Sequence, residues 1–241
     1  MGDRLVIVTG ASRGIGAAIA LRLAETGLLV ACVSRSGALP PAPAELAQRL
    51  LPFTADVTDP LAVRAAIDAA AQSRTVVGLV NNAGLHTEAK SAEVPIEAWN
   101  AVMAANATSV VIGCQAVYPH LLGSGGLIVN IGSFFDKIGV KRTLAYCASK
   151  AAVGAITRVL AVEWAGKGIA VVDVAPGYIV TDLNRDAMAG PLQSYLEKRI
   201  PRGRPGDADD VARLVAGLFA MDLNFLSGET IYIDGAQGIA H

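Results

Sequence analysis

The chain has 241 residues, of which 53% are hydrophobic and 17% charged, and its formal net charge is −1. This composition can bury one large core, and a nearly neutral chain without a basic cluster gives no reason to expect nucleic acid as a partner. No uninterrupted apolar run has the length of a membrane span, and the N-terminus shows no signal-peptide pattern, so we expect a cytoplasmic protein without a membrane partner.

Short apolar runs alternate with longer helical patterns along the chain. Strands are predicted at about Leu5–Thr9, Leu28–Ser34, Leu51–Ala55, Val76–Asn81, Leu127–Ile131, Ala170–Ala175 and Ile231–Ile233. Helices are predicted at about Ile15–Glu25, Pro60–Gln72, Ile96–Leu122, Leu144–Ala165 and Ala208–Met221. Continuous apolar strands are typical of parallel sheets covered on both faces. The alternation therefore predicts an α/β fold, a single Rossmann-like doubly wound domain over residues 1–241 with about seven strands.

Two segments depart from this alternation. Residues 37–43 contain three prolines, so we expect the second crossover to be short or loop-like. Residues 182–204 contain Gly190, Pro191 and Pro201 and break the strand–helix pattern. This second segment is the longest candidate for a mobile element that covers the substrate.

The cysteines and histidines are too few and too scattered for metal or triad chemistry. Neither set has the spacing of a metal site, and an odd number of cysteines in apolar surroundings predicts reduced thiols. The residues concerned are Cys32, Cys114, Cys147, His86, His120 and His241. We therefore expect no metal ion and no Ser-His-Asp triad.

A glycine-rich turn joins the first predicted strand to the first predicted helix. Its residues are Gly10, Ser12, Arg13, Gly14, Ile15 and Gly16, with the spacing G-x3-G-x-G. Glycines allow the backbone to turn sharply and to approach a pyrophosphate, and the helix then offers its N-terminal amides to that anion. The turn predicts a dinucleotide cofactor.

The end of the second predicted strand bears on the choice of cofactor. Dinucleotide folds often carry a carboxylate there for the adenine ribose, but this strand ends in Ser34-Arg35. An arginine attracts a 2′-phosphate that a carboxylate would repel, and Arg13 faces the same region. These residues favour NADP(H) over NAD(H), unless the arginines are simply solvated turn residues.

Two aspartates follow the third predicted strand. Asp59-Pro60 has the pattern of a helix N-cap and first helical residue. Asp56, next to Val57, is left to accept a hydrogen bond from the adenine amino group, or is itself a turn residue.

A third group of polar residues follows the fifth predicted strand. Ser133 ends that strand at the carboxyl edge, where ligands bind in open α/β sheets. Tyr146 and Lys150 are four residues apart and share one face of a predicted helix. A phenol has a pKa of about 10, so a neighbouring ammonium is needed to favour the phenolate.

Taken together, these motifs resemble the short-chain dehydrogenase/reductase family over essentially the whole chain. The residues that carry the resemblance are Thr9–Gly16, Asn81-Asn82-Ala83-Gly84, Ser133, Tyr146 with Lys150, and Pro176-Gly177. The resemblance implies that Tyr146 exchanges the proton with the substrate oxygen, that Ser133 orients this oxygen, and that Lys150 holds the nicotinamide ribose and lowers the pKa of Tyr146.

The resemblance also implies further site residues. Asn106 matches the family's fourth catalytic member, which anchors a water in the proton relay. Asn82, Ala83 and Gly84 would line the adenine-ribose side, while Ile179 and Thr181, after Pro176-Gly177, would fix the carboxamide. The sequence departs from the family pattern at Val77, at Val172-Asp173 and at Gly235-Ala236. These departures concern the scaffold more than the catalytic set.

The substrate is predicted only by class. His86, Phe134, Phe135, Tyr178, Met188 and Tyr195 are candidates for an apolar pocket, which favours ketones over polyols. Within the family the chain is similar to 3-oxoacyl-acyl-carrier-protein reductases and free-standing carbonyl reductases. The uncharged loop Gly123–Gly126 disfavours an acidic carrier protein, with Lys137, Lys141, Arg142 and Lys167 as the cations that could compensate.

Two other functions stay open, an NAD-dependent secondary-alcohol dehydrogenase and an inactive dinucleotide-binding module. The mean hydropathy of +0.46 and the family resemblance lead us to expect a homotetramer.

Overall fold

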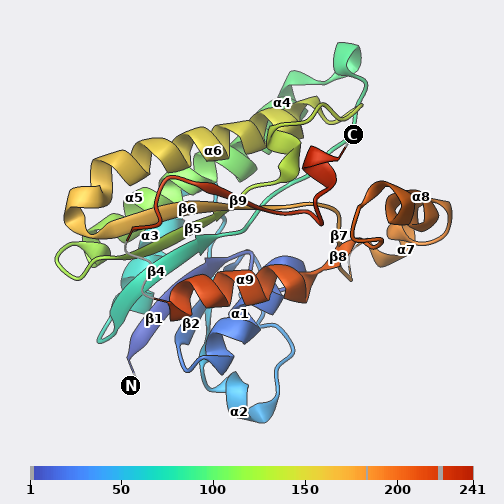
Figure 1. Cartoon of the computed structure of the whole chain (residues 1–241). Coiled ribbons are helices and arrows are strands. Elements are labelled where there is room, and N and C mark those ends of the chain that lie inside the picture. Colours follow the sequence, from blue (N-terminus) through green and yellow to red (C-terminus); the bar gives the residue numbers. More distant parts are fainter. Residues whose placement is uncertain (1–2, 183, 222–224, 241) are drawn as a thin grey trace.

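The computed structural model describes residues 3–182, 184–221 and 225–240 (Figure 1). Seven parallel strands form its main sheet in the order β3-β2-β1-β4-β5-β6-β9. Their bounds are β1 Arg4–Thr9, β2 Leu29–Ser34, β3 Leu50–Thr54, β4 Thr75–Asn81, β5 Gly126–Ile131, β6 Ile169–Pro176 and β9 Thr230–Ile233. The order reverses between β1 and β4, which creates the crevice in which doubly wound sheets bind ligands. The predicted fold class is confirmed.

Helices cover both faces of this sheet (Figure 1). Alternate residues of β1 point to opposite sides: Leu5 and Ile7 pack with α3, α5 and α6, whereas Val6 and Val8 pack with α1 and α9. The helix bounds are α1 Gly14–Glu25, α3 Pro60–Ala71, α5 Ser109–Leu121, α6 Leu144–Trp164 and α9 Ala208–Ala220. Two apolar layers therefore enclose the sheet, as continuous apolar strands require.

The second crossover is short, as predicted. Its helix α2 spans only Ala44–Ala47, after the proline-rich stretch. The N-cap prediction for α3 is also confirmed, because the Asp59 carboxylate accepts hydrogen bonds from the backbone amides of Leu61 and Ala62 at 2.9 and 3.1 Å.

The helix predicted over Ile96–Leu122 contains a π-helical turn. Helix α4 spans Ile96–Met103, a π-helical turn follows at Ala104–Thr108, and α5 then continues to Leu121. The predicted helix is therefore confirmed as one continuous helical segment over Ile96–Leu121, and its π-helical turn is the feature that was not predicted. The apolar period is the same on both sides of such a turn, so the pattern predicted a helix without showing the inserted residue.

The segment from Asp182 to Arg204 contains two helices that the sequence did not predict. These are α7 at Arg185–Met188 and α8 at Pro191–Arg199, and Leu183 lies outside the described residues. Met188, Leu196 and Ile200 form a small apolar cluster between them. A two-stranded pair, β7 (Ile179–Val180) with β8 (Gly206–Asp207), joins the ends of the segment (Figure 1).

Two helical segments are long and apolar enough to cross a membrane by length and composition alone, although polar residues interrupt both. They are Ile96–Leu121 and Leu144–Lys167, and 56% and 39% of their most apolar windows are buried. Many alanines and valines raise their hydropathy, and their inner faces pack on the sheet. Core helices of soluble proteins commonly have this character.

Candidate active site

A cleft of about 1380 Å³ lies at the carboxyl ends of the sheet strands. Every residue predicted to bind cofactor lines it: Gly10, Ser12, Arg13, Gly14, Ile15, Gly16, Ser34, Arg35, Asp56, Val57, Asn82, Ala83, Gly84, Tyr146, Lys150, Pro176, Gly177, Ile179 and Thr181. Ser133 and the substrate candidates His86, Phe134, Phe135, Tyr178 and Met188 also line it. Asn106 and Tyr195 do not. The fold therefore gathers nearly all predicted site residues in one cleft.

The glycine turn has the backbone geometry that its sequence predicts. Gly10 and Gly14 adopt φ angles of +67° and +58°, which side-chain-bearing residues rarely adopt. A β-carbon at Gly16 would collide with the carbonyl oxygen of Gly10. Helix α1 begins here without a side-chain cap and without an acidic residue in its first turn. Its N-terminal amides thus face the cleft as an anion site that fits a pyrophosphate.

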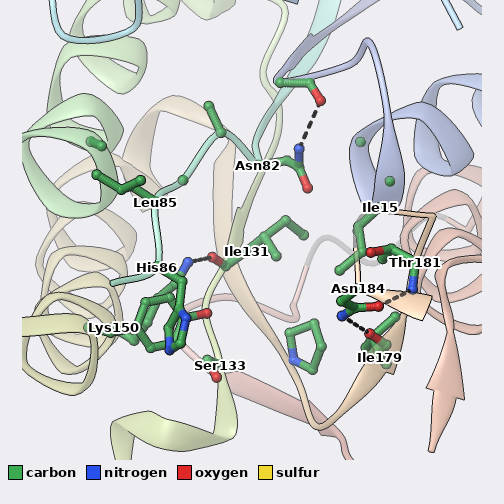
Figure 2. Close-up of a pocket in the computed structure, with 18 of the residues that line it drawn as sticks. Ile15, Asn82, Leu85, His86, Ile131, Ser133, Lys150, Ile179, Thr181 and Asn184 are labelled. Atoms are coloured by element: carbon green, nitrogen blue, oxygen red, sulfur yellow. Dashed lines mark hydrogen bonds between the residues drawn. The ribbon is translucent and has the colours of Figure 1, made fainter. Parts of the chain in front are cut away.

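The end of β4 is tied to this turn. The backbone amides of Asn82 and Ala83 donate to the Thr9 hydroxyl at 3.0 and 3.1 Å, and the Asn82 side chain donates to the Thr9 carbonyl at 3.0 Å. Figure 2 shows the Asn82 side chain reaching toward the glycine turn. The family motif at residues 81–84 therefore fixes the cleft wall.

The end of β2 combines a buried serine with exposed cations. Ser34 is buried, whereas the side chains of Arg13 and Arg35 are exposed at the cleft. Asp56 accepts hydrogen bonds from the Thr58 amide and hydroxyl at 2.9 and 2.8 Å, and these hold the pKa of the carboxyl below its usual value. Asp56 is thus a turn residue that also lines the cleft.

Ser133, Tyr146 and Lys150 meet at the opposite end of the cleft. Ser133 follows β5 and begins a 3-10 turn over Phe134–Asp136, and Tyr146 and Lys150 lie one turn apart on α6. The Lys150 ammonium donates to the Ile131 carbonyl at 2.6 Å and lies 5.7 Å from the centre of the Tyr146 ring (Figure 2). Burial lowers the pKa of Lys150 to about 8.

The pKa of Tyr146 differs from the expectation. Burial raises it above the ordinary value, and a hydrogen bond with Ser133 only partly offsets this rise. The Lys150 ammonium is directed at the Ile131 carbonyl. The tyrosine is therefore a protonated acid at neutral pH, the form needed to donate a proton to a carbonyl oxygen.

Asn106 lies behind the cleft, on the π-helical turn. Its side-chain oxygen accepts from the Leu85 amide at 2.6 Å, and its nitrogen donates to the Leu85 carbonyl at 2.9 Å and to the Ser149 hydroxyl at 3.0 Å. The side chain thus joins the loop after β4 to the helix that carries Tyr146 and Lys150. π-Helical turns are frequent at functional sites.

Comparison with known proteins identifies the family. Residues 4–191 match the short chain dehydrogenase family. The chain belongs to this family. The chain is 35% identical to a D-threitol dehydrogenase from Mycolicibacterium smegmatis, covering 98% of this chain and 93% of that protein. It is also 35% identical to a 3-oxoacyl-acyl-carrier-protein reductase from Staphylococcus aureus, covering 96% of each. A gluconate 5-dehydrogenase from Burkholderia cenocepacia, solved with NADP and tartrate, superposes with a TM-score of 0.89 at 33% identity, covering 100% and 96% of the two chains.

As a short-chain dehydrogenase, the protein is an oxidoreductase of alcohol and carbonyl groups. The family uses NAD or NADP, and the cradle formed by the glycine turn and α1 fits such a dinucleotide.

Aromatic rings surround the tyrosine of this short-chain dehydrogenase. The rings of His86 and Phe135 meet the Tyr146 ring edge to face, with centroids 4.8 and 5.9 Å apart. Tyr178 lies 5.8 Å from Phe135, again edge to face. Met188 is buried and brings the covering segment to the cleft. The wall beside Tyr146 is therefore largely aromatic.

The structure adds residues that the sequence analysis missed. Asn184 lines the cleft, accepts from the Thr181 amide at 2.7 Å and donates to the Ile179 carbonyl at 2.9 Å (Figure 2). Its position directly before α7 is a common one for asparagine, which was the available signal. Glu88 and Thr143 also line the cleft. They come from loops, where sequence carries no periodicity to place a side chain.

Proposed function

We propose that the protein is an NADPH-dependent carbonyl reductase that converts ketones to secondary alcohols and catalyses the reverse oxidation. The preference for NADPH is inferred from the residues at the end of β2. Ser34 stands where an NAD enzyme would carry a carboxylate, and the exposed Arg35 and Arg13 lie on the same part of the cleft. A charge-assisted contact from an arginine to a 2′-phosphate is worth roughly 1.5–3 kcal/mol.

The chain's residues supply the proton chemistry. The bound nicotinamide supplies the hydride. Tyr146, protonated at neutral pH, donates its proton to the carbonyl oxygen, and the Ser133 hydroxyl hydrogen-bonds and orients that oxygen. Lys150 holds the ribose hydroxyls and supplies the positive charge that favours the phenolate left behind. Asn106 anchors a water for reprotonation of the tyrosine.

The pocket wall supports apolar or aryl ketones as the substrate class. His86, Phe135 and Tyr178 present ring edges and faces beside Tyr146, and these rings offer an apolar or aryl ketone a large contact area. The loop before β5, Gly123–Gly126, has no charge to dock an acidic carrier protein. We therefore propose a free ketone, rather than a carrier-bound 3-oxoacyl group, as the substrate.

The segment of residues 182–204 covers the substrate in this proposal. Met188 and Leu192 line the cleft, and both belong to the helical pair α7 and α8. The pair makes its own apolar cluster through Leu196 and Ile200, so it can move as a unit over the bound ketone.

The proposal includes a cytoplasmic homotetramer. Exposed apolar side chains at Ile96, Leu144, Val159 and Val162 lie on α4 and α6, with Val162 81% exposed. Apolar helix faces of this kind pack against second copies of a chain. Cys32, Cys114 and Cys147 are free, in keeping with a reducing compartment. Light scattering should report a mass several times the 24.7 kDa of one chain, and a monomer would refute the tetramer.

Oxidation of NADPH with a panel of ketones, aldehydes, polyols and 3-oxoacyl thioesters tests the function. We expect turnover with apolar or aryl ketones and little with polyols. Preference for the thioesters would replace the proposal by a carrier-protein reductase. Turnover only with NADH would replace it by an NAD-dependent dehydrogenase, and no turnover at all would leave an inactive dinucleotide-binding module.

A further inference from the structure

A buried carboxylate lies directly behind the catalytic end of the cleft. Asp173 is on the central part of β6, in register with Asn130 of β5 and Thr230 of β9, and its side chain is 0% exposed. Its Oδ2 atom accepts from the Thr230 hydroxyl at 3.2 Å. Its Oδ1 atom has no hydrogen-bond partner among the described residues. Burying an incompletely paired carboxylate is costly, so its presence in an otherwise apolar strand needs an explanation.

The Ile131–Gly132 peptide connects this carboxylate to the catalytic lysine. Lys150 donates to the carbonyl of Ile131, while the Asp173 carboxylate packs against the α-carbon of Gly132. A β-carbon at Gly132 would lie 2.7 Å from Oδ2 and closer still to Oδ1, so only glycine fits. The same peptide therefore has the Lys150 cation at its carbonyl and the Asp173 anion beside its glycine, while the Gly132 amide donates to the Val174 carbonyl at 2.8 Å. Ser133 is the next residue, so the arrangement also supports the turn that carries it.

Helix α6 approaches the carboxylate one turn beyond Lys150. A β-carbon at Gly154 would lie 3.9 Å from Oδ2 of Asp173, so this part of the helix is in van der Waals range of the carboxylate. The charged and titratable groups that face Asp173 are few. They are Lys150 on α6, Asp136 on the turn after Ser133, and Tyr232 on β9, with the exposed Arg158 beside Gly154. Among these groups, Lys150 is the buried cation, whereas Arg158 is exposed.

The two groups are electrostatically coupled. Burial raises the pKa of Asp173 to about 6, and Lys150 opposes that rise. Burial lowers the pKa of Lys150 to about 8, and Asp173 opposes that fall. Between these two pH values both groups are charged inside the folded protein. Each charge makes the other tolerable where water is largely excluded.

We propose that Asp173 is a positioning residue that, across the Ile131–Gly132 peptide, keeps the buried Lys150 in its ammonium form. Without the carboxylate, the lysine would lose its proton at lower pH, and the charge that favours the tyrosinate during proton transfer would be lost. A cation bound by Asp173 is not needed for this role, since residues 3–182, 184–221 and 225–240 contain no group of three or more potential metal ligands. The kinetic consequence rests on the proposed reductase function, but the coupling of the two charges does not.

The first experiment measures that coupling without cofactor or substrate. Thermal unfolding is compared for the wild type, Lys150→Met, Asp173→Asn and the double variant at pH 7 and at pH 5. At pH 7 the double variant should be more stable than the sum of the single effects by at least about 2 °C. At pH 5 the coupling should shrink, because Asp173 is then protonated. Additive effects at both pH values would overturn the proposal.

The second experiment measures the pH profile of kcat/KM for ketone reduction. Because burial raises the pKa of Tyr146, Lys150 is the first of the pair to deprotonate as the pH rises. In Asp173→Asn the alkaline decline should therefore begin about one pH unit lower than in the wild type. A merely structural role would lower activity at every pH and leave the profile unshifted, which would count against the proposal.

Asp136→Asn is the matched control. Asp136 is a second aspartate near Asp173. Its Oδ1 atom is buried without a hydrogen-bond partner among the described residues, and its Oδ2 atom accepts from the Tyr232 hydroxyl at 2.8 Å. In Asp136→Asn, the alkaline decline of kcat/KM should begin at the same pH as in the wild type. The effects of Asp136→Asn and Lys150→Met on thermal unfolding should be additive. An equal shift in this variant would mean that any nearby charge has the same effect, and the assignment to Asp173 would fall. If no ketone is reduced, the function proposal fails while the unfolding cycle still decides the role of Asp173.

Discussion

The two ends of the cleft differ in how far their polar and charged side chains are exposed to solvent. At the β5–α6 end, Ser133 and Lys150 are only 7% and 5% exposed, and burial shifts the pKa values of both Tyr146 and Lys150. At the β2 end, the cations Arg13 and Arg35 are exposed to solvent. Buried charges interact strongly and control chemistry, whereas exposed charges are screened and contribute modest, adjustable affinity. The comparison predicts that the β5–α6 end determines the catalytic rate and that the β2 end determines the preference between NADPH and NADH.

The largest effect should come from the tyrosine. Tyr146→Phe removes the proton donor but keeps the ring that packs against His86 and Phe135, so kcat should fall at least about 100-fold. Steady-state kinetics with saturating NADPH measures this, and fluorescence titration should find NADPH affinity nearly unchanged. A variant with near-normal turnover would remove Tyr146 from the mechanism.

Changing the exposed end should alter the choice of cofactor without altering the chemistry. We expect kcat/KM for NADPH to exceed that for NADH by at least about tenfold, the worth of one charged arginine–phosphate contact. Ser34→Asp combined with Arg35→Ala should reverse this preference, because it adds repulsion as well as removing attraction. High salt should weaken the wild-type preference. Equal efficiency with both cofactors in the wild type would mean that Arg35 does not meet the phosphate.

The buried end should also govern the pH dependence. The lowered pKa of Lys150 predicts that kcat/KM for reduction is maintained below pH 8 and lost as the pH rises through about 8. Lys150→Arg, less active but charged at all accessible pH values, should lack this decline. A pH series of initial rates for both proteins makes the comparison. A decline of the same shape in the arginine variant would assign it to another group.

The smallest effect should come from a residue outside both ends. Asp59 caps α3 through two backbone amides, so Asp59→Ala should cost about 1 kcal/mol in the free energy of unfolding. Its kinetic constants should match the wild type. Denaturant unfolding alongside kinetics checks both statements, and a marked loss of activity would show that the cleft depends on α3 more than its two ends suggest.

The sequence predicted what repeated patterns and local chemistry determine. Continuous apolar runs identified the strands of the main sheet, and Asp59-Pro60 identified the start of α3, because each depends on neighbouring residues only. The π-helical turn at Asn106 was missed because the apolar period is that of a helix on both sides of it. The strands β7 and β8 were missed because two residues are too short to form a pattern.

The electrostatics of the site could not be predicted in the same way. Spacing placed Tyr146 and Lys150 on one helix face, but it did not show that the ammonium is directed at the Ile131 carbonyl. The raised pKa of Tyr146 follows mainly from burial, which depends on distant parts of the chain. Asp173 was visible as an unusual residue, yet its relation to Lys150 required the packing of β5, β6 and α6.

A double-mutant cycle of Arg35→Ala and Tyr146→Phe, measured as kcat/KM for NADPH, tests the division of the cleft most directly. The strands that carry the two ends, β2 and β5, are three strand spacings apart, roughly 14 Å. Independent sites at such separation should show additive effects to within about 0.5 kcal/mol, about twofold. We predict that Arg35→Ala lowers kcat/KM by the same factor of roughly 10 to 150 in both backgrounds and leaves kcat at saturating NADPH unchanged. A loss that disappears in the phenylalanine background, or a fall in kcat at saturation, would contradict the account, because the exposed end would then take part in the chemistry.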